Sequence, residues 1–378
     1  MFSKLIAYIN DELCQKRGMP GCDVLIMREH REVFRYQCGY SCIEDQTPVM
    51  GKERYYLYSC TKPITVTGAM RLIEGGMLDL DTPVWDYIPA FRKAYLLNGD
   101  EMVPASKPIT VRHLLTMTAG FDYNLNREPL KRLLSQTDRF ISTVEFANAA
   151  LESPLLSEPG ETFRYSICHD LLGAVIEVVT QMPLSEYLQK AIFYPLQMEH
   201  TGFLTSEKID KSCSPLYIYN ANKQAVERVD DPYRAGLHPT YESGGAGLIS
   251  TVEDYACFAD ALANEGECKN GYRLLLPETV KLMRSEQLKS FSVNDNFTCA
   301  AGNGYGYGLG VRTLISKADC QRSPLGEFGW DGAAGSYVMV DPTNRLSIFF
   351  ATHLLAWPDL LGCAHAPIRD LTYDSLKL

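Results

Sequence analysis

The stretch SCTKPITVTGAMRLIEGG, residues 59–76, decides how the chain is read. Its apolar spacing predicts a helix, and the glycine pair at 75–76 predicts the end of that helix. On a helix, side chains three residues apart share a face, which would bring the Lys62 amine beside the Ser59 hydroxyl. Pro63 can be accommodated in a first helical turn, but it disfavours the α conformation for Lys62. Tertiary contacts must therefore hold Lys62 in place.

A serine next to a lysine in this arrangement can act as a nucleophile. The Ser59 hydroxyl attacks poorly unless a base removes its proton, and an amine does so when burial or nearby positive charge lowers its pKa. The N-terminus of the helix supplies a positive potential that also favours a developing oxyanion. The spacing S-x-x-K arises by chance about once in a chain of this size, so it is weak in isolation.

A second motif is PGETFRYS, residues 159–166, which precedes the helical run ICHDLLGAVIEVV. A tyrosine just before a helix can face a cleft, and a phenol beside an ammonium group can carry protons as a general acid and base. Tyr165 is therefore a candidate for proton transfer. With 22 tyrosines in the chain, a packed Tyr165 with a solvated hydroxyl is the better interpretation when this segment is considered alone.

A third motif is GEFGWDGAAG, residues 326–335, which leads into the β-rich run SYVMVDP. Glycines in a strand allow a ligand to approach the backbone closely. Acyl transfer needs N–H donors where the tetrahedral oxyanion forms, and an exposed strand edge can provide one of them. A β-bulge or tight turn would explain the same glycines.

The β-rich segments lie at the two ends of the chain. Residues 22–39 form two such runs around a polar turn at 29–31, and three more follow Asn303, whereas residues 80–265 contain mainly helical patterns. We therefore predict an α+β fold: an antiparallel β-sheet flanked by N- and C-terminal helical segments, with a large, mainly α-helical inserted region. The expected division is a sheet lobe of 1–79 plus 266–378 and a helical lobe of 80–265, within one domain of 1–378.

Composition and charge limit the classes of molecule that the protein is expected to bind. The formal net charge of -10 and the pI near 5.3 disfavour nucleic acid and anionic membrane surfaces, and leave a small neutral or cationic molecule as the expected ligand. The first residues carry charges where a signal peptide has an apolar core, so we expect a cytoplasmic protein. The 12 cysteines are scattered singly and are interpreted as reduced thiols, and no metal or other cofactor is expected.

Taken together and in order, the three motifs resemble the serine β-lactamase and penicillin-binding-protein superfamily, in the branch of class C β-lactamases, D-amino-acid peptidases and β-lactamase-like esterases. The likeness extends from about Gly21 to His353, because ITVRHLLTMTAGF, ESGGAGLISTVEDYACFADAL and YGYGLGV are similar to that family's connecting segments. The resemblance implies a β-lactamase/transpeptidase-like fold. It also implies that Ser59 is acylated, that Lys62 is a base, and that Tyr165 is the tyrosine of the family's Y-x-N motif.

The remaining site residues follow from the same resemblance. The backbone N–H groups of Ser59 and Ala333 would form the oxyanion hole. Trp330, Asp331 and Gly332 fall where many relatives have K-T-G, so these residues would contact substrate. Asp331 could attract a cationic substrate or simply hold the turn. Asp170, one helical turn after Tyr165, could orient the phenol, although a surface or capping role is the simpler interpretation.

Two departures from the family pattern bear on substrate. Ile167 replaces the asparagine of Y-x-N, which relatives use to bind an acylamino group, and Trp330 replaces a lysine that helps bind a carboxylate. The sequence W-x-G resembles the esterase branch. The expected activity is therefore hydrolysis of small carboxylic esters through an acyl-enzyme on Ser59. The alternatives are a β-lactamase, D-peptidase or acyltransferase with the same chemistry and a small ester or amide substrate, or a non-catalytic binding or sensing module.

Overall fold

The central element is an eight-stranded sheet. The structure is a computed structural model that describes residues 1–203, 213–229, 238, 240–288, 292–293, 303–317 and 322–378. All neighbouring strands of the sheet are antiparallel. In spatial order they are β13 (Tyr305–Tyr307), β14 (Arg312–Leu314), β15 (Phe328–Asp331), β16 (Tyr337–Asp341), β17 (Leu346–Thr352), β1 (Gly21–Arg28), β2 (Arg31–Cys42) and β3 (Thr47–Pro48). The ends of the chain thus build one sheet, which confirms the predicted fold class.

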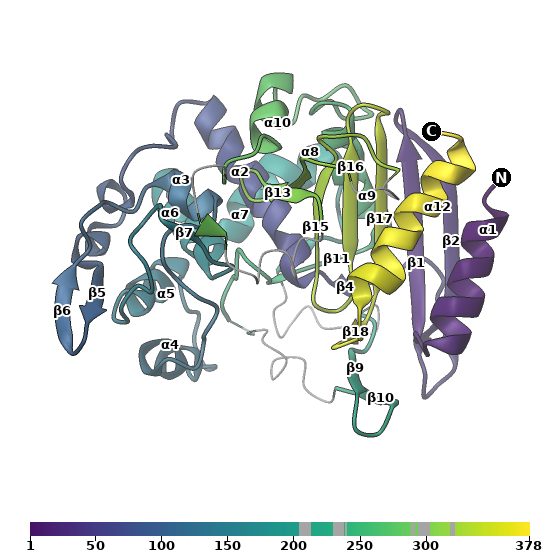
Figure 1. The fold of residues 1–378 in the computed structure, drawn as a ribbon, viewed down its shortest axis with the longest axis horizontal. Coiled ribbons are helices and arrows are strands. Elements are labelled where there is room, and N and C mark those ends of the chain that lie inside the picture. Colours follow the sequence, from purple (N-terminus) through teal and green to yellow (C-terminus); the bar gives the residue numbers. More distant parts are fainter. Residues whose placement is uncertain (204–212, 230–237, 239, 289–291, 294–302, 318–321) are drawn as a thin grey trace.

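The sheet has two buried faces because successive side chains point to opposite sides. On β1, Val24 and Ile26 face one core, whereas Leu25 faces the other. The first face is covered by α1 (Ser3–Ala7), the following wide helical turn η1 (Tyr8–Lys16) and α12 (Ala366–Leu376). Figure 1 shows α1 and α12 on the same side of the molecule, with both termini nearby. The second face is covered by α9 (Val252–Ala263) and, further from β1, by α2 (Thr61–Glu74).

In the middle of the chain helices are the predominant regular structure among the described residues, and much of this region lies to the left of α2 in Figure 1. Its α-helices are α3 (Val111–Leu115), α4 (Glu128–Leu134), α5 (Thr143–Ala150), α6 (Cys168–Thr180), α7 (Leu184–Leu188) and α8 (Tyr194–Leu196), with α10 (Pro277–Met283) further along. The short helical turns are η2 (Tyr58–Cys60), η3 (Val84–Asp86), η4 (Pro89–Lys93), η5 (Gln189–Phe193) and η7 (Leu361–His365). The division into lobes stays a prediction, and the packing of α9 against the sheet favours a boundary before 252 rather than at 265.

Short strands complete the structure. One three-stranded sheet consists of β4 (Tyr55–Tyr56), β11 (Leu248–Ser250) and β8 (Gly202–Phe203), and another of β10 (Ala225–Arg228), β9 (Tyr217–Asn220) and β18 (Leu354–Leu355). The strand pairs are β5 (Tyr95–Asn98) with β6 (Glu101–Pro104), and β7 (Thr162–Phe163) with β12 (Ser292–Val293). Across the described ranges, the helices are too short or too polar to cross a membrane.

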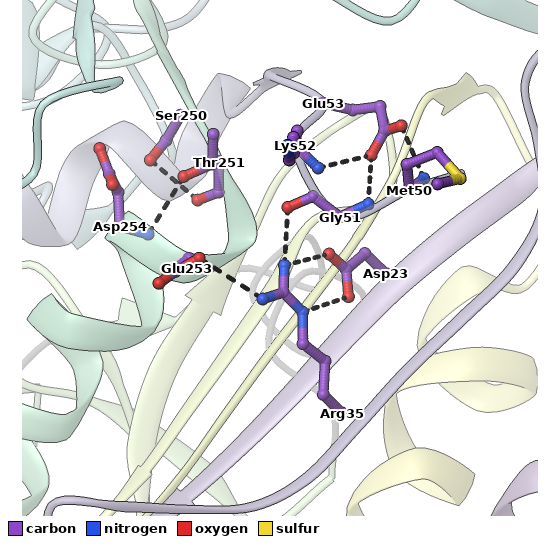
Figure 2. A network of polar contacts seen from close by, with 10 residues as sticks. All are labelled: Asp23, Arg35, Met50, Gly51, Lys52, Glu53, Ser250, Thr251, Glu253 and Asp254. Atoms are coloured by element: carbon purple, nitrogen blue, oxygen red, sulfur yellow. Dashed lines mark hydrogen bonds and ion pairs between the residues drawn. The ribbon is translucent and has the colours of Figure 1, made fainter. Parts of the chain in front are cut away.

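A partly buried ion pair joins the sheet to the segment that leads to Ser59. Asp23 on β1 accepts hydrogen bonds from Arg35 on β2, and the same guanidinium donates to the Gly51 carbonyl at 2.7 Å (Figure 2). Glu253, in the first turn of α9, lies 3.5 Å from another nitrogen of Arg35. Burial raises the pKa of Asp23, and the charge and hydrogen bonds of Arg35 oppose that rise. Arg35 thereby connects two strands, one turn and one helix.

Candidate active site

Ser59 lies at a strained junction between a strand and a helix. Strand β4 ends at Tyr56, and the Leu57 amide donates to the carbonyl of Leu248 on the neighbouring β11. Tyr58 then adopts a φ of 44°, a left-handed conformation that is unfavourable for a tyrosine. The turn η2 carries Ser59 directly into α2. Such strain persists only where the surroundings impose it, and it is common beside functional groups.

Lys62 is fully buried and surrounded by oxygen atoms. Its Nζ lies 3.0 Å from Ser59 Oγ, 3.2 Å from the Tyr123 hydroxyl and 2.7 Å from the Gly245 carbonyl oxygen. An ammonium group can donate to all three atoms. A neutral amine can donate to Gly245 and Tyr123 and direct its lone pair at the Ser59 hydroxyl. The geometry therefore satisfies both forms that a base passes through during a proton transfer.

These contacts also account for the conformation before Pro63. Lys62 is helical, and Pro63 sits in the first turn of α2, where a missing N–H costs little. The side chain of Lys62 is fixed at its far end by the carbonyl of Gly245, 183 positions along the chain. Long-range contacts thus hold the residue that the local sequence disfavours in a helix.

Tyr165 reaches the same serine from the other side. Its hydroxyl donates to Ser59 Oγ at 2.6 Å, and the indole N–H of Trp330 donates to the Tyr165 oxygen at 3.2 Å. The Tyr165 ring stacks between Tyr123 and Trp330, with centroid distances of 5.5 Å to each. Lys62 Nζ also lies 4.8 Å from the centroid of the Tyr165 ring. Ser59 therefore contacts both predicted proton carriers at once.

Trp330 and Asp331 are the last two residues of strand β15, and their side chains contact other residues of the protein. Trp330 is 2% exposed. Asp331 forms an ion pair with Arg312 of β14, and Arg312 is buried against the rings of Trp330, Tyr305 and Tyr337. The negative charge of Asp331 is therefore compensated inside the protein. This pairing favours a structural role for Asp331 over attraction of a cationic substrate.

The turn after β15 packs against the backbone just before Ser59. A Cβ atom at Gly332 would lie 2.2 Å from the Leu57 carbonyl oxygen, so only glycine fits there. The Ser336 hydroxyl donates to the same carbonyl at 2.9 Å, and the Gly332 amide donates to the Ser336 carbonyl. Ala333 is at the exposed tip of this turn. Its assignment to the oxyanion hole stays a prediction, supported by this close contact between the turn and the Ser59 segment.

Two further predicted residues are buried. Ile167 precedes α6, is 3% exposed and belongs to the main core. Its contact with substrate stays a prediction. Asp170 is also buried and accepts hydrogen bonds from the Ser243 hydroxyl, the Tyr241 hydroxyl and the Gly245 amide. The predicted contact with the Tyr165 phenol is therefore replaced by contacts to the loop that presents Gly245 to Lys62, and Asp170 is not a surface residue.

Sequence reasoning missed two members of the site, Tyr123 and Gly245. Tyr123 stands among 22 tyrosines, and its segment carries no chemical motif. Gly245 contributes only its carbonyl, which no residue type identifies. The adjacent pair Gly244-Gly245 did contain a usable signal, because paired glycines often mark a close approach of backbone to another group. A Cβ atom at Gly245 would lie 2.6 Å from an Asp170 carboxylate oxygen.

Comparisons with known proteins agree with the predicted fold and with the family resemblance. The family model described as Beta-lactamase matches residues 4–366. The chain is 28% identical to Protein Rv1367c of Mycobacterium tuberculosis over 90% of this chain and 87% of that protein. It is 27% identical to Esterase EstB of Burkholderia gladioli over 96% and 93%. The solved structure of "EstCE1, a hydrolase with promiscuous acyltransferase activity" superposes with a TM-score of 0.81 at 28% identity, covering 98% of this chain and 99% of that one. The chain therefore belongs to the beta-lactamase family and has its class C-like serine hydrolase fold.

Proposed function

We propose that the protein hydrolyses small, uncharged carboxylic esters through an acyl-enzyme on Ser59. The observation that carries the proposal is the position of Ser59 Oγ, 3.0 Å from the Lys62 amine and 2.6 Å from the Tyr165 hydroxyl. A serine flanked by two groups that can exchange protons has the arrangement needed for nucleophilic catalysis.

In the proposed reaction, Ser59 loses its proton to the neutral Lys62 amine as Oγ attacks the ester carbonyl. The backbone N–H groups of Ser59 and Ala333 stabilise the tetrahedral oxyanion. Tyr165 donates its proton to the departing alcohol and recovers one from Lys62. The steps then run in reverse with water in place of the alcohol, which releases the acid and regenerates Ser59.

The preference for an uncharged acyl group rests on the replacement of the family's lysine by Trp330. The Asp331 carboxylate beside it is neutralised by Arg312. Neither residue therefore offers a free charge to a substrate carboxylate or a cationic substrate. The likeness to Esterase EstB, over almost the whole of both chains, supports an ester as the substrate.

A second candidate is acyl transfer from Ser59 to an alcohol other than water. EstCE1 is a hydrolase with promiscuous acyltransferase activity, and its likeness to this chain extends over nearly the whole of both proteins. The two reactions share the acyl-enzyme and differ only in the acceptor. Adding a primary alcohol during ester turnover and measuring the new ester separates them.

The test of the proposal is intact-mass spectrometry of wild type and Ser59→Ala after exposure to a fluorophosphonate or to penicillin. We expect a fluorophosphonate adduct that Ser59→Ala lacks, no penicillin adduct, and turnover of short-chain aryl esters by wild type alone. A stable or transient penicillin adduct on Ser59 would instead favour β-lactam or D-peptide recognition. An unlabelled, folded wild type would contradict the catalytic assignment and favour a binding module.

A further inference from the structure

A pair of thiols lies on the face of the sheet opposite to α9. Cys14, in η1, has its Sγ 3.0 Å from the Sγ of Cys38 in β2. Both residues are partly exposed. Closing this distance to a disulfide bond requires a movement of about 1 Å. Cys14 and Cys38 are therefore already adjacent in the reduced protein and need no rearrangement of secondary structure to react.

We propose that Cys14 and Cys38 form a redox modification site, at which a hydroperoxide converts the two thiols into a reversible disulfide. This inference is independent of the proposed ester hydrolysis. It is consistent with the prediction that the cysteines are reduced thiols, because the reaction starts from the reduced Cys14 and Cys38.

The surroundings distinguish the two sulfurs. The Cys14 thiol, by hydrogen bonding to the Cys38 sulfur, lowers the pKa of Cys38 to about 7, against the opposing effect of burial. The same hydrogen bond and burial raise the pKa of Cys14. In its thiol form Cys38 can also donate to the Asn10 side-chain oxygen at 3.1 Å, an atom that accepts from Tyr36 as well. Cys38 is thus the sulfur that ionises first, and Cys14 is the resolving thiol.

The reaction balances with the hydroperoxide as the only oxidant. The Cys38 thiolate attacks one peroxide oxygen: an S–O bond forms, the O–O bond breaks, and the departing oxygen takes up a proton to leave as water or an alcohol. The Cys14 sulfur then attacks Cys38: the S–S bond forms, the S–O bond breaks, and hydroxide leaves with the Cys14 proton as water. The two sulfurs lose two electrons, and the peroxide gains them.

A third thiol provides a control for geometry. Cys22 on β1 lies opposite Cys38 in the strand register but is fully buried, and burial raises its pKa well above the ordinary value. Cys257 provides a control for exposure, because the residue is exposed and has no second sulfur within hydrogen-bonding distance in the described ranges, although partial burial of its thiol raises its pKa to about 11. If the pair is oxidised faster than both Cys22 and Cys257, accessibility alone does not explain the difference.

The disulfide would connect the N-terminal helical segment to the sheet without touching the Ser59 site. Cys22 and the neighbouring apolar residues of β1 belong to the core under α1, η1 and α12, and Cys14 and Cys38 pack against that core. Ser59 and α2 lie on the other side of the sheet. Oxidation should raise the unfolding temperature by tethering the helix, and dithiothreitol should reverse the increase.

The experiment exposes the full-length chain to hydrogen peroxide, blocks the remaining thiols with N-ethylmaleimide and maps the peptides. We expect a Cys14–Cys38 link that forms at least tenfold faster than oxidation of Cys257 and disappears with dithiothreitol. Cys14→Ser should form no link and should accumulate a Cys38 sulfenic acid that dimedone captures, whereas Cys22→Ala should still form the link. Full alkylation of both thiols after peroxide, a Cys22–Cys38 link, or equal oxidation of Cys257 would overturn the proposal. The wild-type peptide map decides among these outcomes even if a variant does not fold.

Discussion

The indole N–H of Trp330 donates a hydrogen bond to the Tyr165 oxygen at 3.2 Å, and Tyr165 in turn lies 2.6 Å from Ser59 Oγ. Trp330 is therefore connected to the candidate nucleophile through the phenol. The ring of Trp330 also stacks on that of Tyr165. Trp330 thus contributes to the site in two separable ways, through its ring and through its N–H group.

Replacing Trp330 with Phe retains an aromatic ring and removes the N–H donor. A neutral hydrogen bond contributes about 1 kcal/mol, so we expect kcat/KM for an aryl ester to fall roughly fivefold to tenfold. Steady-state kinetics measure this change. Trp85→Phe is the matched control, because Trp85 packs against Arg92 away from Ser59 and should retain full activity. Unchanged activity in Trp330→Phe would show that the N–H group is not used.

The two tyrosines beside Lys62 should differ in importance. Tyr165→Phe removes a proposed proton carrier, and kcat should fall by about 10²–10⁴. Tyr123→Phe removes only one hydrogen-bond partner of Lys62, so a decrease of about tenfold is expected. Tyr194→Phe, at an exposed position, serves as the control. Equal losses for Tyr123→Phe and Tyr165→Phe would assign proton transfer to the pair rather than to Tyr165.

The Arg312–Asp331 ion pair should contribute to the free energy of unfolding. Asp331→Asn leaves the buried guanidinium of Arg312 without its counter-ion and should cost about 3 kcal/mol in urea unfolding. The double variant Arg312→Met with Asp331→Asn removes the stranded charge and should be more stable than Asp331→Asn alone. In the exposed pair Arg132–Glu152, Glu152→Gln should cost no more than about 1 kcal/mol. A double variant less stable than Asp331→Asn would contradict this account.

Buried histidines should make the protein sensitive to acid. Burial lowers the pKa of His353 to about 4 and that of His365 to about 3. In the unfolded chain a histidine takes up a proton near pH 6.5, so below that pH the unfolded state binds more protons than the folded state. The stabilising contribution of each neutral histidine is complete above pH 6.5 and decreases until the folded pKa is reached.

In urea unfolding between pH 7 and pH 4, each of these histidines should contribute a decrease in the free energy of unfolding, with a slope of up to about 1.4 kcal/mol per pH unit as the pH falls. His353→Asn removes one titrating group and should reduce that slope by about this amount. The comparison of slopes is informative even if the substitution lowers stability at pH 7. An unchanged slope in His353→Asn would mean that His353 is already protonated in the folded protein.

The sequence by itself determined the features that depend on local spacing. β-rich runs separated by turn residues at the two ends of the chain predicted the antiparallel sheet, because short turns join neighbouring antiparallel strands. The three-residue spacing of Ser59 and Lys62 predicted their contact, since a helical turn brings such side chains together. The positions of Tyr165 and Trp330 followed from motif order rather than from geometry.

Only the tertiary structure decided which distant groups complete the site. Tyr123 and the Gly245 carbonyl reach Lys62 from 61 and 183 positions along the chain, and Arg312 neutralises Asp331 from the neighbouring strand. The same holds for Asp170, whose carboxylate holds the Gly245 loop instead of the Tyr165 phenol. Local periodicity specifies which face of an element is apolar, but the partner of a polar group depends on how elements pack, and backbone carbonyls carry no residue-specific signal.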